Sequence, residues 1–172
     1  MQAIIWTDYG PPGVLQLQEI AKPAPKDDEI LVKIIAANVF PGDCELRRFQ
    51  IHPLYWLPLR LAIGIRKPRV KILGQEFSGI VESVGTQVTR FKPGDEVVSP
   101  TGLGGAYAEY LCLKGNHAAF KPLNVSHTEA ATVSVGGLNA LHLMRTAEIE
   151  AGQSVLLNGA PVHRFADAQG YD

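Results

Sequence analysis

Short apolar stretches separated by turns that contain glycine or proline dominate the first 125 residues. Apolar positions run almost without a break from Ile30 to Ala37, which predicts a strand covered on both faces. Further strands are expected at 3–6, 14–18, 77–84, 96–98 and 106–113. The clearest turn between them is Lys-Pro-Gly-Asp at 92–95. Short strands joined in this way are typical of a β-barrel or a β-sandwich.

The pattern changes near residue 125. Ser126 and Glu129 match a capping box, in which the hydroxyl and the carboxylate satisfy the first backbone N–H groups of a helix. Apolar residues at three-residue steps then predict a second helix over 134–148, and an apolar Val-Leu-Leu at 155–157 predicts a buried strand. Helices followed by an apolar strand are how a parallel α/β sheet begins.

Composition excludes several classes of protein. Hydrophobic residues make up 46% of the 172 residues and charged residues 19%, which is enough apolar material for a folded core. The net charge of -1 argues against a nucleic-acid partner. No apolar run reaches the roughly 18 residues of a membrane span, so we expected no membrane partner. Two isolated cysteines and an N-terminus without a signal-peptide pattern favour a cytoplasmic location.

The strongly apolar segment 54–65 is interrupted by Pro58, Arg60 and Gly64. It is too short to span a bilayer as a helix, so it is either a flap over a cleft or a buried wall. We favour the wall of a substrate cleft, which makes Trp56 a candidate cleft residue. Basic residues without an intervening acid follow closely and can attract a phosphate or an anionic surface, although a solvated loop is the simpler interpretation: Arg60, Arg66, Lys67, Arg69 and Lys71.

Metal and phosphate motifs are weak. The five histidines lie at scattered positions without a nearby cysteine, so no metal site is expected. The glycines at 102–105 precede a strand pattern and are interpreted as a turn, whereas Gly136 lies near a helix start and can let a ligand approach the backbone. The apolar strand at 155–157 is followed by Asn158, Gly159 and Ala160, but the glycines of a phosphate loop do not follow.

Polar residues that are expected to be buried beside apolar stretches form the remaining candidates. Each of them taken singly is more often a structural hydrogen-bonding group than a functional one. They are Asn38, Asp43, Gln75, Glu76 and Asn139.

Taken together in order and spacing, these segments resemble the medium-chain dehydrogenase/reductase superfamily, and specifically its zinc-independent quinone oxidoreductase branch. The matching segments are Asn-Val-Phe-Pro-Gly-Asp at 38–43, Leu-Gly-Gln-Glu-Phe-Ser-Gly at 73–79, Val-Thr-Arg-Phe-Lys-Pro-Gly-Asp-Glu-Val at 88–97, Gly-Ala-Tyr-Ala-Glu-Tyr at 105–110 and Gly-Gly-Leu-Asn-Ala-Leu at 136–141.

The resemblance implies a mainly β fold with some helix. A GroES-like β-barrel that carries the substrate side of the cleft would occupy residues 1–125. The first helices and strand of an incomplete Rossmann domain would follow at 126–160, and residues 161–172 would form a tail unlike the family.

The resemblance also implies chemistry without zinc. In the zinc-dependent relatives a cysteine stands at the position of Phe40 and a histidine at that of Gln75, while Cys44 is out of register. The family transfers a hydride from NADPH or NADH to quinones or to activated carbonyl and alkene compounds.

By the same resemblance Asn38 and Asp43 are candidate catalytic residues. Asn38, Gly136 and Asn139 are candidates for binding the nicotinamide cofactor, and Phe40, Trp56 and Gln75 line the substrate cleft. Asn139 departs from the threonine that many relatives have. No residue stands out as a general acid.

The end of the sequence departs most from the family. Pro161 replaces the start of the Gly-rich loop and has no N–H to offer a phosphate. We therefore expect the chain alone to be inactive. A shifted reading frame, an alternative ending or a shortened chain would each account for this departure from the family. Burying each residue from Val155 to Leu157 would stabilise the fold by about 1.5–3 kcal/mol. If these residues stay exposed, we expect the chain to self-associate through them.

Two other functions stay open at this point. One is a non-enzymatic barrel module that acts through protein contacts. The other is a scaffold that binds a small molecule and keeps half of the substrate cleft of the family.

Overall fold

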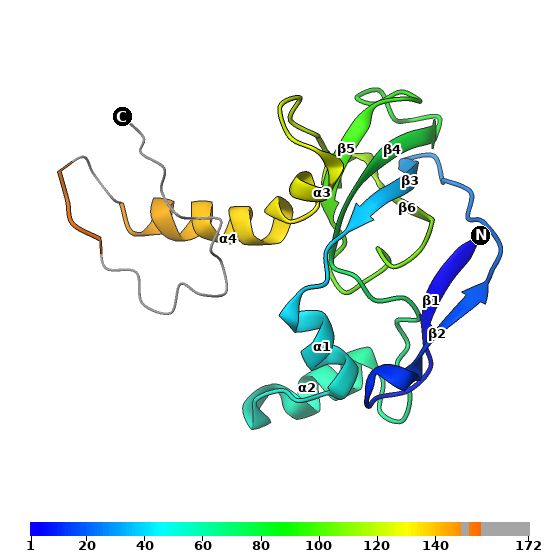
Figure 1. Cartoon of the computed structure of the whole chain (residues 1–172), viewed down its shortest axis with the longest axis vertical. Helices are drawn as coiled ribbons and strands as arrows, with labels where there is room; N and C mark the ends of the chain where they lie inside the picture. The colour runs from blue at the N-terminus through cyan, green and yellow to red at the C-terminus, as the bar shows by residue number, and fades with distance from the viewer. Residues whose placement is uncertain (149–151, 156–172) are drawn as a thin grey trace.

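The structure is a computed structural model that describes residues 1–148 and 152–155. An antiparallel five-stranded sheet forms its centre, in the order β6-β3-β4-β5-β7 (Figure 1). A two-stranded sheet pairs β1 with β2 beside it. The strands are β1 (Gln2–Trp6), β2 (Leu15–Glu19), β3 (Glu29–Ala37), β4 (Glu76–Val84), β5 (Glu96–Pro100), β6 (Tyr110–Lys114) and β7 (Ala119–Phe120).

The core of the large sheet is packed around its two long central strands, β3 and β4. Alternate residues of each strand point inward, so Ile30, Val32, Phe77 and Val81 are buried together with Val97 of β5. The small sheet is joined to this core by the isolated bridges Ala3–Ala108 and Ile5–Ile72. The expected mainly β architecture with some helix is confirmed.

Several expected strand limits were wrong in detail. The strand predicted at 106–113 begins only at Tyr110, because residues before it bridge to β1 instead. The middle strand is not covered on both faces throughout, since Lys33 and Ile35 of β3 are exposed.

Two helices lie in a segment for which no helix was predicted: α1 (Pro41–Arg48) and α2 (Pro53–Ile63). Each begins at a proline, whose fixed φ suits the first helical position and whose missing N–H costs nothing there. Figure 1 shows both helices below the large sheet, at one end of the molecule. They pack on a second apolar cluster built from Trp6, Phe49, Ile63 and Leu73.

The predicted helices after residue 125 are confirmed as α3 (His127–Ala130) and α4 (Val133–Thr146). Ser126 and Glu129 form the expected capping box. In Figure 1 α3 lies against the large sheet, whereas α4 extends away from it. The predicted strand at 155–157 lies outside the described residues, except for Val155, which is half exposed and in no regular element.

Candidate functional site

Asp43 is a buried carboxylate at the start of α1, where the chain leaves β3. Its Oδ1 accepts a hydrogen bond from the backbone N–H of Gly74 (3.2 Å). Its Oδ2 accepts from the backbone N–H of Phe40 (3.2 Å) and from the hydroxyl of Tyr107 (2.9 Å). These three donors compensate for the loss of water around the buried carboxylate. They also hold the loop before α1 against Gly74, which lies just before β4.

Glu76, the first residue of β4, is a second carboxylate and is even more deeply buried. Its Oε1 accepts a hydrogen bond from the side-chain amide of Asn38 (2.7 Å). Its Oε2 accepts from the hydroxyl of Ser134 (3.0 Å) and from the backbone N–H of Val135 (2.8 Å). Since both donors of Oε2 belong to the first turn of α4, Glu76 joins the central sheet, Asn38 and α4 at one point.

Tyr107 links the two carboxylates. Its hydroxyl donates to Asp43 and has the carbonyl oxygen of Asn38 as a second acceptor at 3.3 Å. Burial raises the pKa of Tyr107 above its usual value, and the negative charge of Asp43 adds to the effect. The phenol therefore stays protonated and acts as a permanent donor.

Phe40 and Gln75, two predicted cleft residues, meet around Gly42. A Cβ placed at Gly42 would lie 2.8 Å from the Phe40 ring and 3.1 Å from the Gln75 amide nitrogen. The side-chain amide of Gln75 and the amide oxygen of Asn38 make none of the hydrogen bonds found within the described residues. The Gln75 amide, with unused hydrogen-bonding capacity, thus lies next to an aromatic ring, and Asn38 keeps an unused amide oxygen beside Glu76.

The other predicted site residues lie apart from this cluster. Trp56 is on α2, and its ring contacts Phe49 and Arg60. Gly136 and Asn139 are on α4 beyond the turn that Glu76 holds, and Asn139 is exposed rather than buried as expected. It is exposed because the part of α4 that carries it extends away from the sheet (Figure 1).

The described residues include no group of three metal-ligating side chains. The ring of Phe40 and the amide of Gln75 are not zinc ligands. A hollow of about 350 Å³ lies elsewhere, beside the Lys114–Asp28 ion pair, and none of the predicted site residues lines it. We give the polar cluster more weight than this hollow, because the hollow is open and its Asp28 and Lys114 side chains pair with each other.

Comparison with known proteins places this geometry in a family. Residues 26–124 match the model of the alcohol dehydrogenase GroES-like domain. The chain belongs to this family. It is 34% identical over 164 residues to a quinone oxidoreductase of Lama guanicoe, a match that covers 93% of this chain and 46% of that protein.

Solved structures agree with the family assignment. The quinone oxidoreductase of Coxiella burnetii matches with a TM-score of 0.74 and 29% identity over 88% of this chain and 46% of that one. The Escherichia coli quinone oxidoreductase in complex with NADPH matches with a TM-score of 0.71 and 29% identity, over 86% of this chain and 41% of that one. The resemblance to the medium-chain dehydrogenase/reductase superfamily is thereby confirmed, and the chain spans about half the length of the relatives it matches.

Sequence reasoning missed Tyr107 and Ser134 as members of the site. Tyr107 is 64 residues from Asp43 and Ser134 is 58 residues from Glu76, so no local pattern connects them. Tyr107 does lie in the family-like segment 105–110, which is the signal that could have pointed to it.

Alanine at Gly74 should disturb the site through Tyr107. Gly74 has φ +97°, and a Cβ there would lie 2.6 Å from the Tyr107 ring. Gly94 is a matched control, with φ +94° and no atom within 4 Å of an added Cβ. We expect Gly74→Ala to lower the free energy of unfolding by about 1–3 kcal/mol more than Gly94→Ala does, as measured by urea denaturation. Equal losses would show that Tyr107 does not pack there.

Glutamine at Glu76 should weaken the junction between sheet and helix. Its amide would place N–H donors against the donors of Asn38 or of α4, so we expect a loss of about 1–3 kcal/mol in urea denaturation. Glu82→Gln on the same strand removes only an exposed ion pair with Lys22 and should lower the free energy of unfolding clearly less than Glu76→Gln does. The Val135 backbone amide should exchange its hydrogen faster in Glu76→Gln but not in Glu82→Gln. Unchanged exchange in Glu76→Gln would argue against a contact between Glu76 and the start of α4.

The raised pKa of Tyr107 predicts a loss of stability at high pH. Below the ordinary tyrosine pKa of about 10, folded and unfolded chains are both protonated and the contribution is constant. Above it the unfolded chain ionises first, so stability falls with rising pH. Tyr107→Phe should make this fall smaller, whereas Tyr55→Phe at an exposed site should not, with pH-dependent urea denaturation as the measurement. A fall of the same size in both variants would contradict the assignment.

Proposed function

We propose that this chain provides the substrate-side lobe of an NAD(P)H-dependent oxidoreductase of the quinone reductase type. The observation that carries the proposal is the amide of Gln75 beside the ring of Phe40, together with the amide of Asn38 on Glu76, both with hydrogen-bonding capacity that the described residues leave unused. The amide N–H groups of Gln75 and the second N–H of Asn38, whose first N–H is donated to Glu76, can donate to the carbonyl oxygens of a quinone, and an aromatic ring can stack on its face. The family assignment supports the same substrate class.

Each residue of the site has a proposed task. Asn38 orients the substrate through the amide that Glu76 holds in place, and Phe40 and Gln75 line the cleft. Asp43 is a positioning residue, because all its described hydrogen bonds are made to Phe40, Gly74 and Tyr107. In the proposed arrangement Tyr107 keeps its proton and holds the loop that carries Asn38.

We propose that the described residues contribute to one end of the cofactor's site only. Asn38, Gly136 and Asn139 stay our candidates for the nicotinamide end, and NADPH when bound would supply the hydride. Within 1–148 and 152–155, no Gly-rich turn follows a strand and opens a helix, which is the arrangement that binds a pyrophosphate. We therefore propose that these 172 residues alone neither hold NADPH tightly nor reduce a quinone. No zinc is part of the proposal, and a cytoplasmic location and self-association through 155–157 stay predictions.

A titration of a water-soluble quinone into the ¹⁵N-labelled chain tests the substrate site. The side-chain amide signals of Asn38 and Gln75 should shift in a saturable way, and Asn38→Leu should weaken binding by about tenfold because it removes a hydrogen bond to the ligand. Asn124→Leu, at an exposed loop position, is the matched control and should bind as the unaltered chain does.

The same preparation tests the cofactor part of the proposal. NADPH added up to about 1 mM should cause no saturable shift of the amide signals and should not be oxidised. A dissociation constant above this concentration corresponds to a binding free energy weaker than roughly 4 kcal/mol. Micromolar NADPH binding would contradict this part. Absence of any quinone effect on Asn38 and Gln75 would contradict the substrate site.

A further inference from the structure

Helix α2 carries an apolar stripe on the face opposite the protein core. Leu54, Leu57 and Leu61 recur at three- and four-residue steps and are 71%, 60% and 52% exposed. The inward face of the same helix carries Ile63, which is buried in the second apolar cluster, and Leu59, which packs against that cluster. The helix therefore has two apolar faces, of which only one is covered by the described residues.

The outward stripe is presented by a firmly held helix. The guanidinium of Arg60 lies 3.8 Å from the ring centre of Tyr9 and 4.4 Å from that of Phe49. The Tyr9 hydroxyl donates to the carbonyl of Gly64 at the end of α2 (2.7 Å), and the ring nitrogen of His52 accepts from the Leu54 N–H at its start. These contacts fix both ends of α2, so the exposed leucines are a surface and not a frayed segment.

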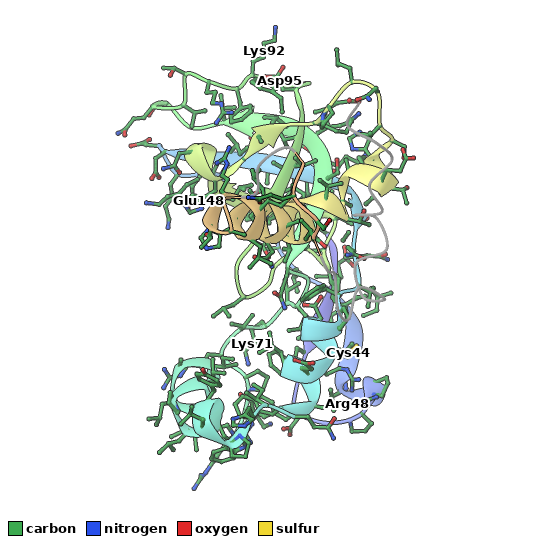
Figure 2. The ribbon with its side chains drawn as sticks, turned by 90° about the vertical axis from the view of Figure 1, so that its left-hand side faces the viewer. Cys44, Arg48, Lys71, Lys92, Asp95 and Glu148 are labelled. Atoms are coloured by element: carbon green, nitrogen blue, oxygen red, sulfur yellow. The ribbon has the colours of Figure 1, made fainter. Side chains whose placement is uncertain are left out.

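Positive charge is concentrated around this helix. Between Glu45 and Glu76 the sequence contains seven of the 16 lysines and arginines and none of the 17 acidic residues. Five of the seven are exposed, and no ion pair of theirs is found within the described part of the chain: Arg48, Arg66, Lys67, Arg69 and Lys71. In Figure 2 the labelled Arg48 and Lys71 lie in the same lower part of the molecule as α2, whereas Lys92 and Asp95 lie at the opposite end.

We propose that α2 and the basic residues around it form a binding surface for an anionic lipid bilayer. An apolar helix face sinks into the boundary between headgroups and acyl chains, and nearby lysines and arginines are attracted by negatively charged headgroups. Tyr55 and Trp56 on the same helix are residue types enriched at that boundary. This surface is separate from the residues that carry the proposed function, because it uses neither Asn38 nor Phe40 nor Gln75; it includes Trp56, which the sequence predicts for the cleft.

The binding is peripheral. An 11-residue helix is about 16 Å long, half of what a span requires. In the described part of the chain, no helix meets the length and hydropathy needed to cross a membrane. Our expectation of no membrane partner rested on the length of apolar runs, which tests spanning and leaves peripheral binding open.

Vesicle binding by the full 172-residue chain tests the proposal. The probe is a vesicle of phosphatidylcholine with about 30% phosphatidylserine, with pure phosphatidylcholine as the neutral control. The chain should sediment with the anionic vesicles only, and binding should weaken as salt rises. Fluorescence of Trp56 should shift to shorter wavelength on binding, while Trp6, which is buried, supplies a constant background.

Two pairs of variants locate the surface. Lys67→Glu should weaken binding at least about fivefold, whereas Lys92→Glu changes the net charge equally at the far end and should change binding less than about twofold. Leu57→Glu should weaken binding more than about tenfold, whereas Leu123→Glu, at a 98% exposed position, should not. If Leu57→Glu fails to fold by circular dichroism, the lysine pair decides.

Four results would overturn the proposal. These are no sedimentation with anionic vesicles, equal effects of Lys67→Glu and Lys92→Glu, full binding by a folded Leu57→Glu, or a leucine-dependent dimer that does not bind vesicles. The last result would assign the stripe to a second copy of the chain.

Discussion

The carboxylate of Glu76 is the constraint on which the site depends. It is almost inaccessible to water, and an unpaired charge there would be very costly, so its three donors must be in place for the chain to fold as it does. One of these donors orients Asn38 and two belong to α4. The same interaction that satisfies the buried charge therefore sets the position of a candidate substrate-binding amide and of the helix that leads into the following part of the family fold.

Asp43 has a similar structural role at the other end of the loop between β3 and α1. Its hydrogen bonds to Tyr107 and to two backbone N–H groups hold the segment that presents Phe40. With both carboxylates used internally, the groups left to face a ligand are the amides of Asn38 and Gln75 and a phenyl ring. In the proposed function such a surface would orient a carbonyl compound and supply no acid or base, so the chemistry would come from a cofactor.

The strands of the barrel could be predicted because apolar runs between Gly- and Pro-containing turns are a local signal. The capping box at Ser126 was equally local and correct. Helices α1 and α2 were not predicted: the apolar segment 54–65 was interpreted as interrupted by Pro58, which lies inside α2, and the prolines that begin the two helices were not recognised as first helical positions. In the site, Asn38 and Asp43 were chosen from motifs, but their partners Glu76 and Tyr107 approach through tertiary packing that a linear pattern does not encode.

A double-mutant cycle between Asn38 and Ser134 tests the central role of Glu76 most directly. The two side chains come from different elements and share only the Glu76 carboxylate. Urea denaturation of Asn38→Ala, Ser134→Ala and the double variant should give a coupling free energy of at least about 0.5 kcal/mol. Strictly additive losses would contradict the account, because they would mean that the buried carboxylate does not connect the substrate loop to α4.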